Sequence, residues 1–185
     1  MRQTRTLLVF GILLIGGSAT TFTDDGGPRK IDVHLSGYQE TLVALSTAGN
    51  GHFVARISKD GTQIAWQLSY GDLEGTVTQS HIHFGARAQT GGISVFLCSN
   101  LGNGPAGTQA CPTSASETSP LTGVAMAADV IGPTAQGIAP GEFSELVAAI
   151  REGVAYVNVH STKYPGGEIR AQFPDMDRDH GHYHH

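Results

Sequence analysis

Short runs in which apolar and polar residues strictly alternate restrict the fold of this chain more than any other feature. In the first run, Ile31, Val33 and Leu35 alternate with polar residues, and such positions share one face of a β-strand. The other predicted strands are 53–57, 64–70, 77–84, 93–98, 154–160 and 168–173, with 124–131 as a further candidate. Many short strands separated by turn signals such as Asp60-Gly61 predict an all-β antiparallel sandwich or barrel.

One segment follows the helical period instead. Its apolar residues, spaced i, i+3, i+4 and i+7, are Phe143, Leu146, Val147 and Ile150. They lie between Pro140 and Gly153, residues typical of the start and the end of a helix. We therefore expect one short helix in a crossover between strands. A composition with 25 glycines and only 15% charged residues agrees with a turn-rich β protein rather than a helical bundle.

Residues 1–19 have the pattern of a secretory signal peptide. Arg2 and Arg5 precede an apolar run over 7–15, which is too short to cross a bilayer and is followed by small residues. An uncleaved N-terminal anchor is the alternative. The polar residues 20–29 are predicted to be a flexible lead-in. The protein is therefore expected to be secreted or periplasmic, with no membrane span in the mature chain.

The charge of the mature chain excludes some classes of partner. Without residues 1–19 the chain has 9 basic and 16 acidic residues, a net charge of −7. An acidic surface without basic runs argues against nucleic acid and anionic membranes as partners.

Two cysteines, Cys98 and Cys111, occur in a chain that we expect to be exported. An oxidising compartment favours a disulfide over two free thiols. The bond would close the base of a long loop, 99–120, that is rich in Gly, Ser, Thr, Asn and Pro. In the chain-entropy model it would contribute about 3 kcal/mol.

Three histidines at strand ends are the candidate site. His81 and His83 are alternate residues of one strand, so both imidazoles point to the same face with their Cα atoms about 7 Å apart. His160 ends a strand in which it shares a face with Tyr156 and Asn158. Each motif alone is compatible with ordinary surface or structural histidines, but together three imidazoles suit copper or zinc.

Other histidines are weaker candidates. His34 and His52 are predicted on outward faces, where either is a fourth ligand or an ordinary surface residue. Residues 174–185 are predicted to be an acidic, His-rich disordered tail that binds metal without a fold. Its potential ligands are Asp175, Asp177, Asp179, His180, His182, His184 and His185. An added sequence or a simple solubilising tail is the alternative.

Several of these stretches resemble the CHRD domain, a family named after the chordin proteins. The similar segments are 31–40 (IDVHLSGYQE), 80–85 (SHIHFG), 156–161 (YVNVHS) and 167–170 (GEIR). The resemblance covers about residues 30–173 and is most specific in its closing motif. The chain departs from the family at 41–43, where prolines are usual, and in the cysteine-bearing loop.

A weaker resemblance concerns the copper-binding strand of copper/zinc superoxide dismutases. The segment His81–Gly85 looks like that strand, and His160 is similar in place to their remaining non-bridging copper ligand. This resemblance implies a Greek-key antiparallel β-sandwich and copper ligation by the three histidines. The metal-bridging histidine and the zinc loop have no counterpart in 99–120. Arg170 is only loosely comparable to an anion-guiding charge.

Together these observations predict an exported β-sandwich that binds copper through His81, His83 and His160, with zinc as the alternative metal. The expected role is metal handling or redox protection. One alternative is a non-catalytic module that binds extracellular proteins, and another is a superoxide dismutase that uses copper alone. Catalysis is left open, and a non-catalytic role is favoured.

Overall fold

The computed structural model describes residues 30–176, so the expected signal peptide, the lead-in and the tail from residue 177 lie outside the described residues. Within them, eight antiparallel strands form one sheet in the order β5-β4-β7-β8-β1-β2-β3-β6. The strands are β1 (Lys30–Ser36), β2 (Asn50–Ile57), β3 (Ile64–Gly71), β4 (Val77–Phe84), β5 (Gly92–Ser99), β6 (Leu121–Ala125), β7 (Ala155–Ser161) and β8 (Ile169–Gln172). No helix in residues 30–176 has the length and apolar character needed to span a membrane.

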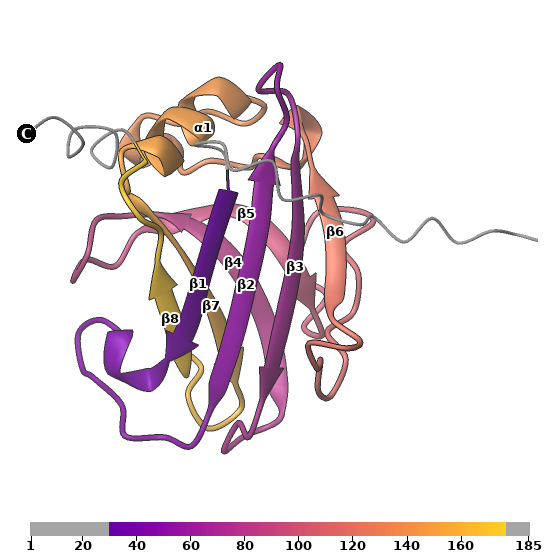
Figure 1. Ribbon diagram of the computed structural model, residues 1–185, viewed down its shortest axis with the longest axis vertical. Helices are drawn as coiled ribbons and strands as arrows, with labels where there is room; N and C mark the ends of the chain where they lie inside the picture. Colours follow the sequence, from indigo (N-terminus) through magenta and orange to yellow (C-terminus); the bar gives the residue numbers. More distant parts are fainter. Residues whose placement is uncertain (1–29, 177–185) are drawn as a thin grey trace, which may run out of the picture.

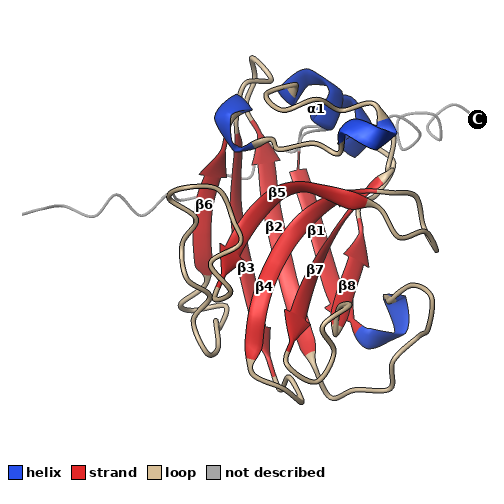
Figure 2. Cartoon of the chain, turned by 180° about the vertical axis from the view of Figure 1, so that it is seen from behind, coloured by secondary structure: helices blue, strands red, loops and turns tan. Residues whose placement is uncertain are grey.

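The sheet folds over into two layers. β1, β2, β3 and β6 form the layer in front in Figure 1, and β4, β5 and β7 lie behind them, as the reverse view of Figure 2 also shows. β1 and β8 are paired through a single residue pair, Ser36 with Arg170. The pairings β3–β6 and β4–β7 join strands that are not consecutive, as Greek-key connections require. The predicted all-β sandwich is therefore confirmed.

The core lies between the two layers and is closed at one end by α1 (Phe143–Arg151), which belongs to the β6–β7 crossover (Figure 1). The apolar residues of the strands point into it, among them Ile31, Phe53 and Ile82. The predicted helix is confirmed, because all four apolar residues at helical spacing are buried. The helix covers apolar side chains that the open end of the sandwich would otherwise expose to water.

Two predicted boundaries differ from the structure. β6 is five residues long and does not run through 124–131, because a turn begins at Met126, whose N–H donates to the Asp129 carboxylate (2.8 Å). At the C-terminus, packing continues three residues into the expected tail. Met176 is buried, and its N–H donates to the carbonyl of Arg151 (2.8 Å).

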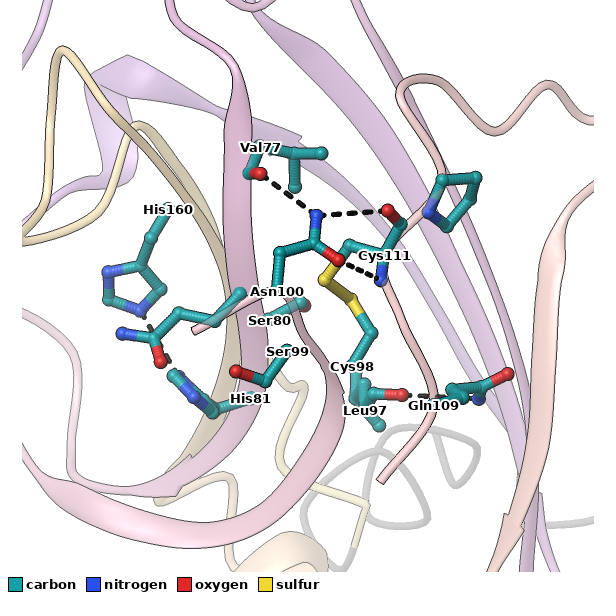
Figure 3. Close-up of a disulfide and its surroundings, with 12 residues drawn as sticks. Val77, Ser80, His81, Leu97, Cys98, Ser99, Asn100, Gln109, Cys111 and His160 are labelled. Atoms are coloured by element: carbon teal, nitrogen blue, oxygen red, sulfur yellow. Dashed lines mark hydrogen bonds between the residues drawn. A yellow bond between two sulfur atoms is a disulfide. The ribbon is translucent and has the colours of Figure 1, made fainter. Parts of the chain in front are cut away.

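The long loop after β5 is fastened to the sandwich by a disulfide between Cys98 and Cys111, as predicted. Beside it, the Asn100 amide donates to the carbonyls of Val77 and Cys111 and accepts the Cys111 N–H (Figure 3). A side-chain amide that satisfies three backbone groups orders a loop without regular structure. The disulfide and Asn100 therefore hold the loop base against the strand that carries His81.

Candidate functional site: a buried three-histidine cluster

The site lies on the face of β4, β7 and β8 that points away from the core. Cross-strand pairing brings His81 opposite Asn158, and Asn158 opposite Arg170. Alternation alone predicts that this face is exposed to water, yet these residues are almost completely buried. Backbone carbonyls from loops 37–49, 85–91 and 162–168 accept hydrogen bonds from side chains on this face. The result is a polar layer outside the hydrophobic core.

Three imidazoles meet in this layer. The Nδ1 atom of His81 lies 3.2 Å from the Nε2 atom of His160, and Figure 3 shows the two rings pointing toward each other. The ring centroid of His81 is 5.3 Å from that of His83 and 5.0 Å from that of His160. One ring nitrogen from each residue lies within 4.8 Å of the other two. The structure thus brings together all three histidines that the sequence singled out.

Backbone carbonyls fix the orientation of two of the rings. His83 donates from Nδ1 to the carbonyl of Gly91 (3.0 Å), and His160 donates from Nδ1 to the carbonyl of Pro165 (2.9 Å). The Nε2 atom of His160 therefore faces His81, while the Nε2 atom of His83 lies 3.1 Å from the side-chain amide of Asn158. Metal-ligating histidines usually donate their second ring N–H in this way, which sets tautomer and orientation.

His81 is the most enclosed member of the cluster. The Nδ1 atom of His160 is a donor, so the Nε2 atom of His160 accepts a hydrogen bond from the Nδ1–H group of His81. The Nε2 atom of His81 therefore carries a lone pair. This atom is buried and has no hydrogen-bond partner among the described residues. An unsatisfied buried polar atom is costly. A metal bound at Nδ1 would move the ring proton to Nε2 and remove the direct His81–His160 hydrogen bond.

The backbone at position 91 lies so close to the backbone of Phe84 that only glycine fits there. A Cβ atom at this position would lie 1.8 Å from the carbonyl oxygen of Phe84, so no other residue fits. The same residue accepts the His83 hydrogen bond and donates its N–H to the hydroxyl of Tyr156 (3.1 Å). Gly91 therefore positions the loop that orients His83.

Burial keeps the three imidazoles neutral. It lowers the pKa of His81 to about 2, with the neighbouring His160 and His83 adding to the shift. Burial likewise lowers the pKa of His83 to about 4 and the pKa of His160 below its usual value. Neutral imidazole is the form that ligates a metal, because protons compete for the same lone pair. The cluster is therefore in its ligating form at neutral pH.

The donor set fits a transition metal. With metal–nitrogen bonds of about 2.0 Å, ligand nitrogens lie about 3.3 Å apart in a tetrahedral arrangement. The His81–His160 separation of 3.2 Å already matches this spacing. The ring nitrogens of the whole group lie within 4.8 Å of one another, so binding of one ion by all three would require the rings to move closer together. Three imidazoles suit copper and zinc alike, so the geometry does not choose between them.

Arg170 is buried next to the cluster, against the ring of Tyr156. Its side chain is 1% exposed, and its guanidinium carbon lies 3.7 Å from the centroid of the Tyr156 ring. It also donates to the carbonyl of Ala86 (3.2 Å) and to the side chain of Gln172 (2.8 Å). A guanidinium held in this way supports the Tyr156 ring. The anion-guiding role that the loose resemblance suggests for Arg170 stays a prediction.

His34 and His52 do not join the cluster. They pair across β1 and β2 and stack on each other with ring centroids 4.4 Å apart. His52 also contacts the carboxylates of Asp32 (2.7 Å) and Glu117 (3.3 Å). Neither histidine belongs to the group of potential ligands around His81. The tail histidines lie outside the described residues.

Sequence reasoning missed the residues that surround the cluster. Burial raises the pKa of the Glu40 carboxyl, which lies in loop 37–49, to about 7, although the Arg170 charge opposes the shift. Nothing in the local pattern singles out Glu40, because its surroundings come from residues more than a hundred positions away. The alternation of β7 did carry a signal for Tyr156 and Asn158, which share a face with His160.

The comparisons with known proteins agree with the motifs that carried the resemblance. Residues 31–173 match the family model described as the CHRD domain, which is well over half of the chain. No curated protein and no solved structure matches it. The matched segment includes all three clustered histidines and both cysteines. The chain therefore belongs to the CHRD domain family.

Proposed function

We propose that this CHRD domain binds copper through His81, His83 and His160, in metal handling or redox protection outside the cytoplasm. The observation that carries the proposal is the convergence of three neutral imidazoles whose ring nitrogens lie within 4.8 Å of one another. His83 and His160 would ligate through Nε2, and His81 through Nδ1, the atom that faces His160. Copper bound there would supply a redox centre, and zinc remains the alternative metal.

The cellular setting of this proposal rests on two findings. CHRD domains occur in extracellular proteins, and the disulfide between Cys98 and Cys111 is consistent with an oxidising compartment. In such a compartment, a tail rich in histidine and aspartate would capture metal and raise its concentration near the buried cluster.

A non-catalytic interaction module is the second candidate. It is favoured by exposed apolar side chains in loop 37–49, where Tyr38, Leu42 and Val43 are exposed. Exposed apolar groups in one loop are typical of contact surfaces. Under this alternative the three histidines only order the neighbouring loops through Gly91 and Pro165. Metal binding separates the two candidates.

The test measures copper binding by isothermal titration calorimetry on protein lacking residues 177–185, purified without an affinity metal. Replacing His81, His83 or His160 singly by Ala should weaken copper binding by about tenfold or more, because each removes one of three ligands. His34→Ala, which removes an imidazole outside the cluster, is the matched control and should leave the affinity unchanged.

Two outcomes would contradict the proposal. Unchanged copper stoichiometry in the triple variant would remove the cluster as the site. Equal loss in the His34→Ala control would show that binding is not specific to the cluster. Should copper bind as proposed, a superoxide-decay assay on the loaded protein tests the alternative of a copper-only superoxide dismutase.

A further inference from the structure

A cleft leads from the surface to the His83 side of the cluster. It has a volume of about 370 Å³ and lies between loop 37–49 and the loop 162–168. Figures 1 and 2 show the first of these loops beside β8, at the edge of the sandwich. The floor of the cleft is formed by His83, Tyr156 and Asn158. A cavity of this size is typical of sites for small organic molecules.

The walls of the cleft are mostly apolar. Leu42, Val43 and Leu45 line one side, and Tyr164 and Pro165 line the other. Leu42 is 91% exposed and Val43 66% exposed, so both apolar side chains stand at the mouth in contact with water. Covering these apolar groups with a ligand removes their surface from water, which favours binding.

The backbone at the mouth is strained in a way that supports a binding role. Leu42 has a φ of 71°, in the left-handed region that a residue with a Cβ atom rarely adopts. Such strain costs on the order of 1 kcal/mol and clusters at ligand clamps. Next to Leu42, the hydroxyl of Thr41 lies 3.1 Å from the hydroxyl of Thr90, and this contact joins loop 37–49 to loop 85–91. The fold thus holds Leu42 outward.

Charge at the cleft does not favour an anion. The charged residues that line it are Glu40 and Lys163. The ammonium of Lys163 is paired with the carboxylate of Glu74, and the guanidinium of Arg170 lies against the Tyr156 ring. The cleft therefore offers no unpaired cation among its described residues. Of its inner polar groups, the Asn158 amide already contacts His83 (3.1 Å). The Oε1 atom of Glu40 is buried and has no hydrogen-bond partner among the described residues, so it can accept a hydrogen bond from a neutral group.

We propose that this cleft binds a small neutral organic molecule, with an apolar body of about the size of an aromatic ring and one hydroxyl group that points toward Glu40. The proposal names the ligand class of the same site and rests on the proposed function only for placing that ligand beside a metal. The apolar body contacts Leu42, Val43 and Leu45. The hydroxyl group donates to the Oε1 atom of Glu40, which an apolar molecule would leave unpaired.

The test is an NMR titration of the metal-free full-length protein, in a chelator, with phenol, toluene and benzoate as probes. Phenol should shift the methyl resonances of Leu42, Val43 and Leu45 saturably. Toluene should bind about fivefold more weakly, because it leaves the Oε1 atom of Glu40 unpaired. Benzoate should bind about tenfold more weakly, because its charge loses water without gaining a cation.

A matched pair of variants locates the site. Leu42→Ser should weaken phenol binding by about fivefold through lost apolar contact. Leu101→Ser changes another exposed leucine, in the loop after β5, and should have no effect. Both residues are exposed, so neither variant is expected to unfold the protein.

Several outcomes would overturn the proposal. Benzoate that binds as tightly as phenol would be one such outcome. The absence of saturable resonance shifts up to about 20 mM phenol would be another. The third would be an equal effect of Leu42→Ser and Leu101→Ser on phenol affinity. A His81→Ala variant keeps this test separate from that of the copper site. His81 does not line the cleft, so the variant should lose copper binding and retain phenol binding.

Discussion

The imidazole of His83 lies flat against the phenol ring of Tyr156, with 2° between the ring planes and 4.7 Å between their centroids. On its other side, Tyr156 faces the guanidinium of Arg170. A cation over an aromatic ring and two stacked rings form a continuous column. One end of the column is the guanidinium of Arg170, which donates hydrogen bonds to Ala86 and Gln172. The other end is a histidine of the cluster. The orientation of His83 therefore depends on residues from three strands.

Removing the middle of this column should destabilise the protein and disturb the cluster. We expect Tyr156→Leu to lower the free energy of unfolding by about 2–4 kcal/mol, since it leaves a cavity and deprives Arg170 of its aromatic partner. Tyr156→Phe removes only the hydroxyl contact with Gly91 and should cost about 1 kcal/mol. Urea unfolding measures both. Equal losses of stability in the two variants would contradict a role for stacking. Tyr38→Leu, which changes an exposed tyrosine, is the control and should have little effect on stability.

A methyl group at Gly91 should act on His83 through the backbone. The Cβ atom of Gly91→Ala would overlap the carbonyl oxygen of Phe84, so we expect the free energy of unfolding to fall by about 3 kcal/mol or more. Copper affinity should fall with it, because the Gly91 carbonyl orients His83. Gly71→Ala places a methyl group in open space and should change neither quantity. Wild-type copper affinity in a folded Gly91→Ala variant would argue against this coupling.

The metal-free protein should lose stability as the pH falls below about 6.5. The folded pKa values of His81, His83 and His160 are below that of free histidine, so the unfolded state binds up to three more protons than the folded state. Between about pH 7 and 4.5, Glu40 has the opposite effect on stability. Its pKa in the folded state is raised to about 7, so there the folded state binds one more proton than the unfolded state. The net difference is at most two protons, which sets an upper bound of about 2.7 kcal/mol per pH unit on the slope.

Urea unfolding at several pH values between 7 and 5 measures this slope. A variant with all three histidines replaced by Gln should show a flatter profile, since the groups that take up protons on unfolding are gone. A flat profile for the unaltered protein would mean that the cluster is protonated in the folded state. In saturating copper, the free energy of unfolding should fall more steeply as the pH is lowered, because protons then also compete with the metal for the imidazoles.

The disulfide should contribute measurably to stability. Replacing Cys98 and Cys111 together by Ala should lower the free energy of unfolding by about 3 kcal/mol, as the bond links residues 13 positions apart. Asn100→Ala keeps the bond but removes hydrogen bonds beside it, and should cost about 1–3 kcal/mol. Mass spectrometry without reduction should show a deficit of two hydrogens. Two alkylatable thiols in freshly exported protein would contradict the bond.

The local pattern of the sequence was enough to predict the strands and the helix. Ile31, Val33 and Leu35 alternate, and Phe143 to Ile150 follow the helical period, because both patterns arise from backbone geometry within a few residues. The same local rule placed His81 and His83 on one face. The end of β6 was missed because it depends on a side-chain contact between Asp129 and the Met126 backbone.

Only the tertiary structure decided what those histidines contact. The alternation of β4 and β7 is equally compatible with a solvated outer face, and resemblance alone suggested His160 as a third partner. Pairing of β4 with β7 brings His81 next to a strand nearly eighty residues later. Loops from three other parts of the chain then bury the face and lower the pKa of each imidazole. Burial and long-range pairing depend on the whole fold, and no short window of sequence contains them.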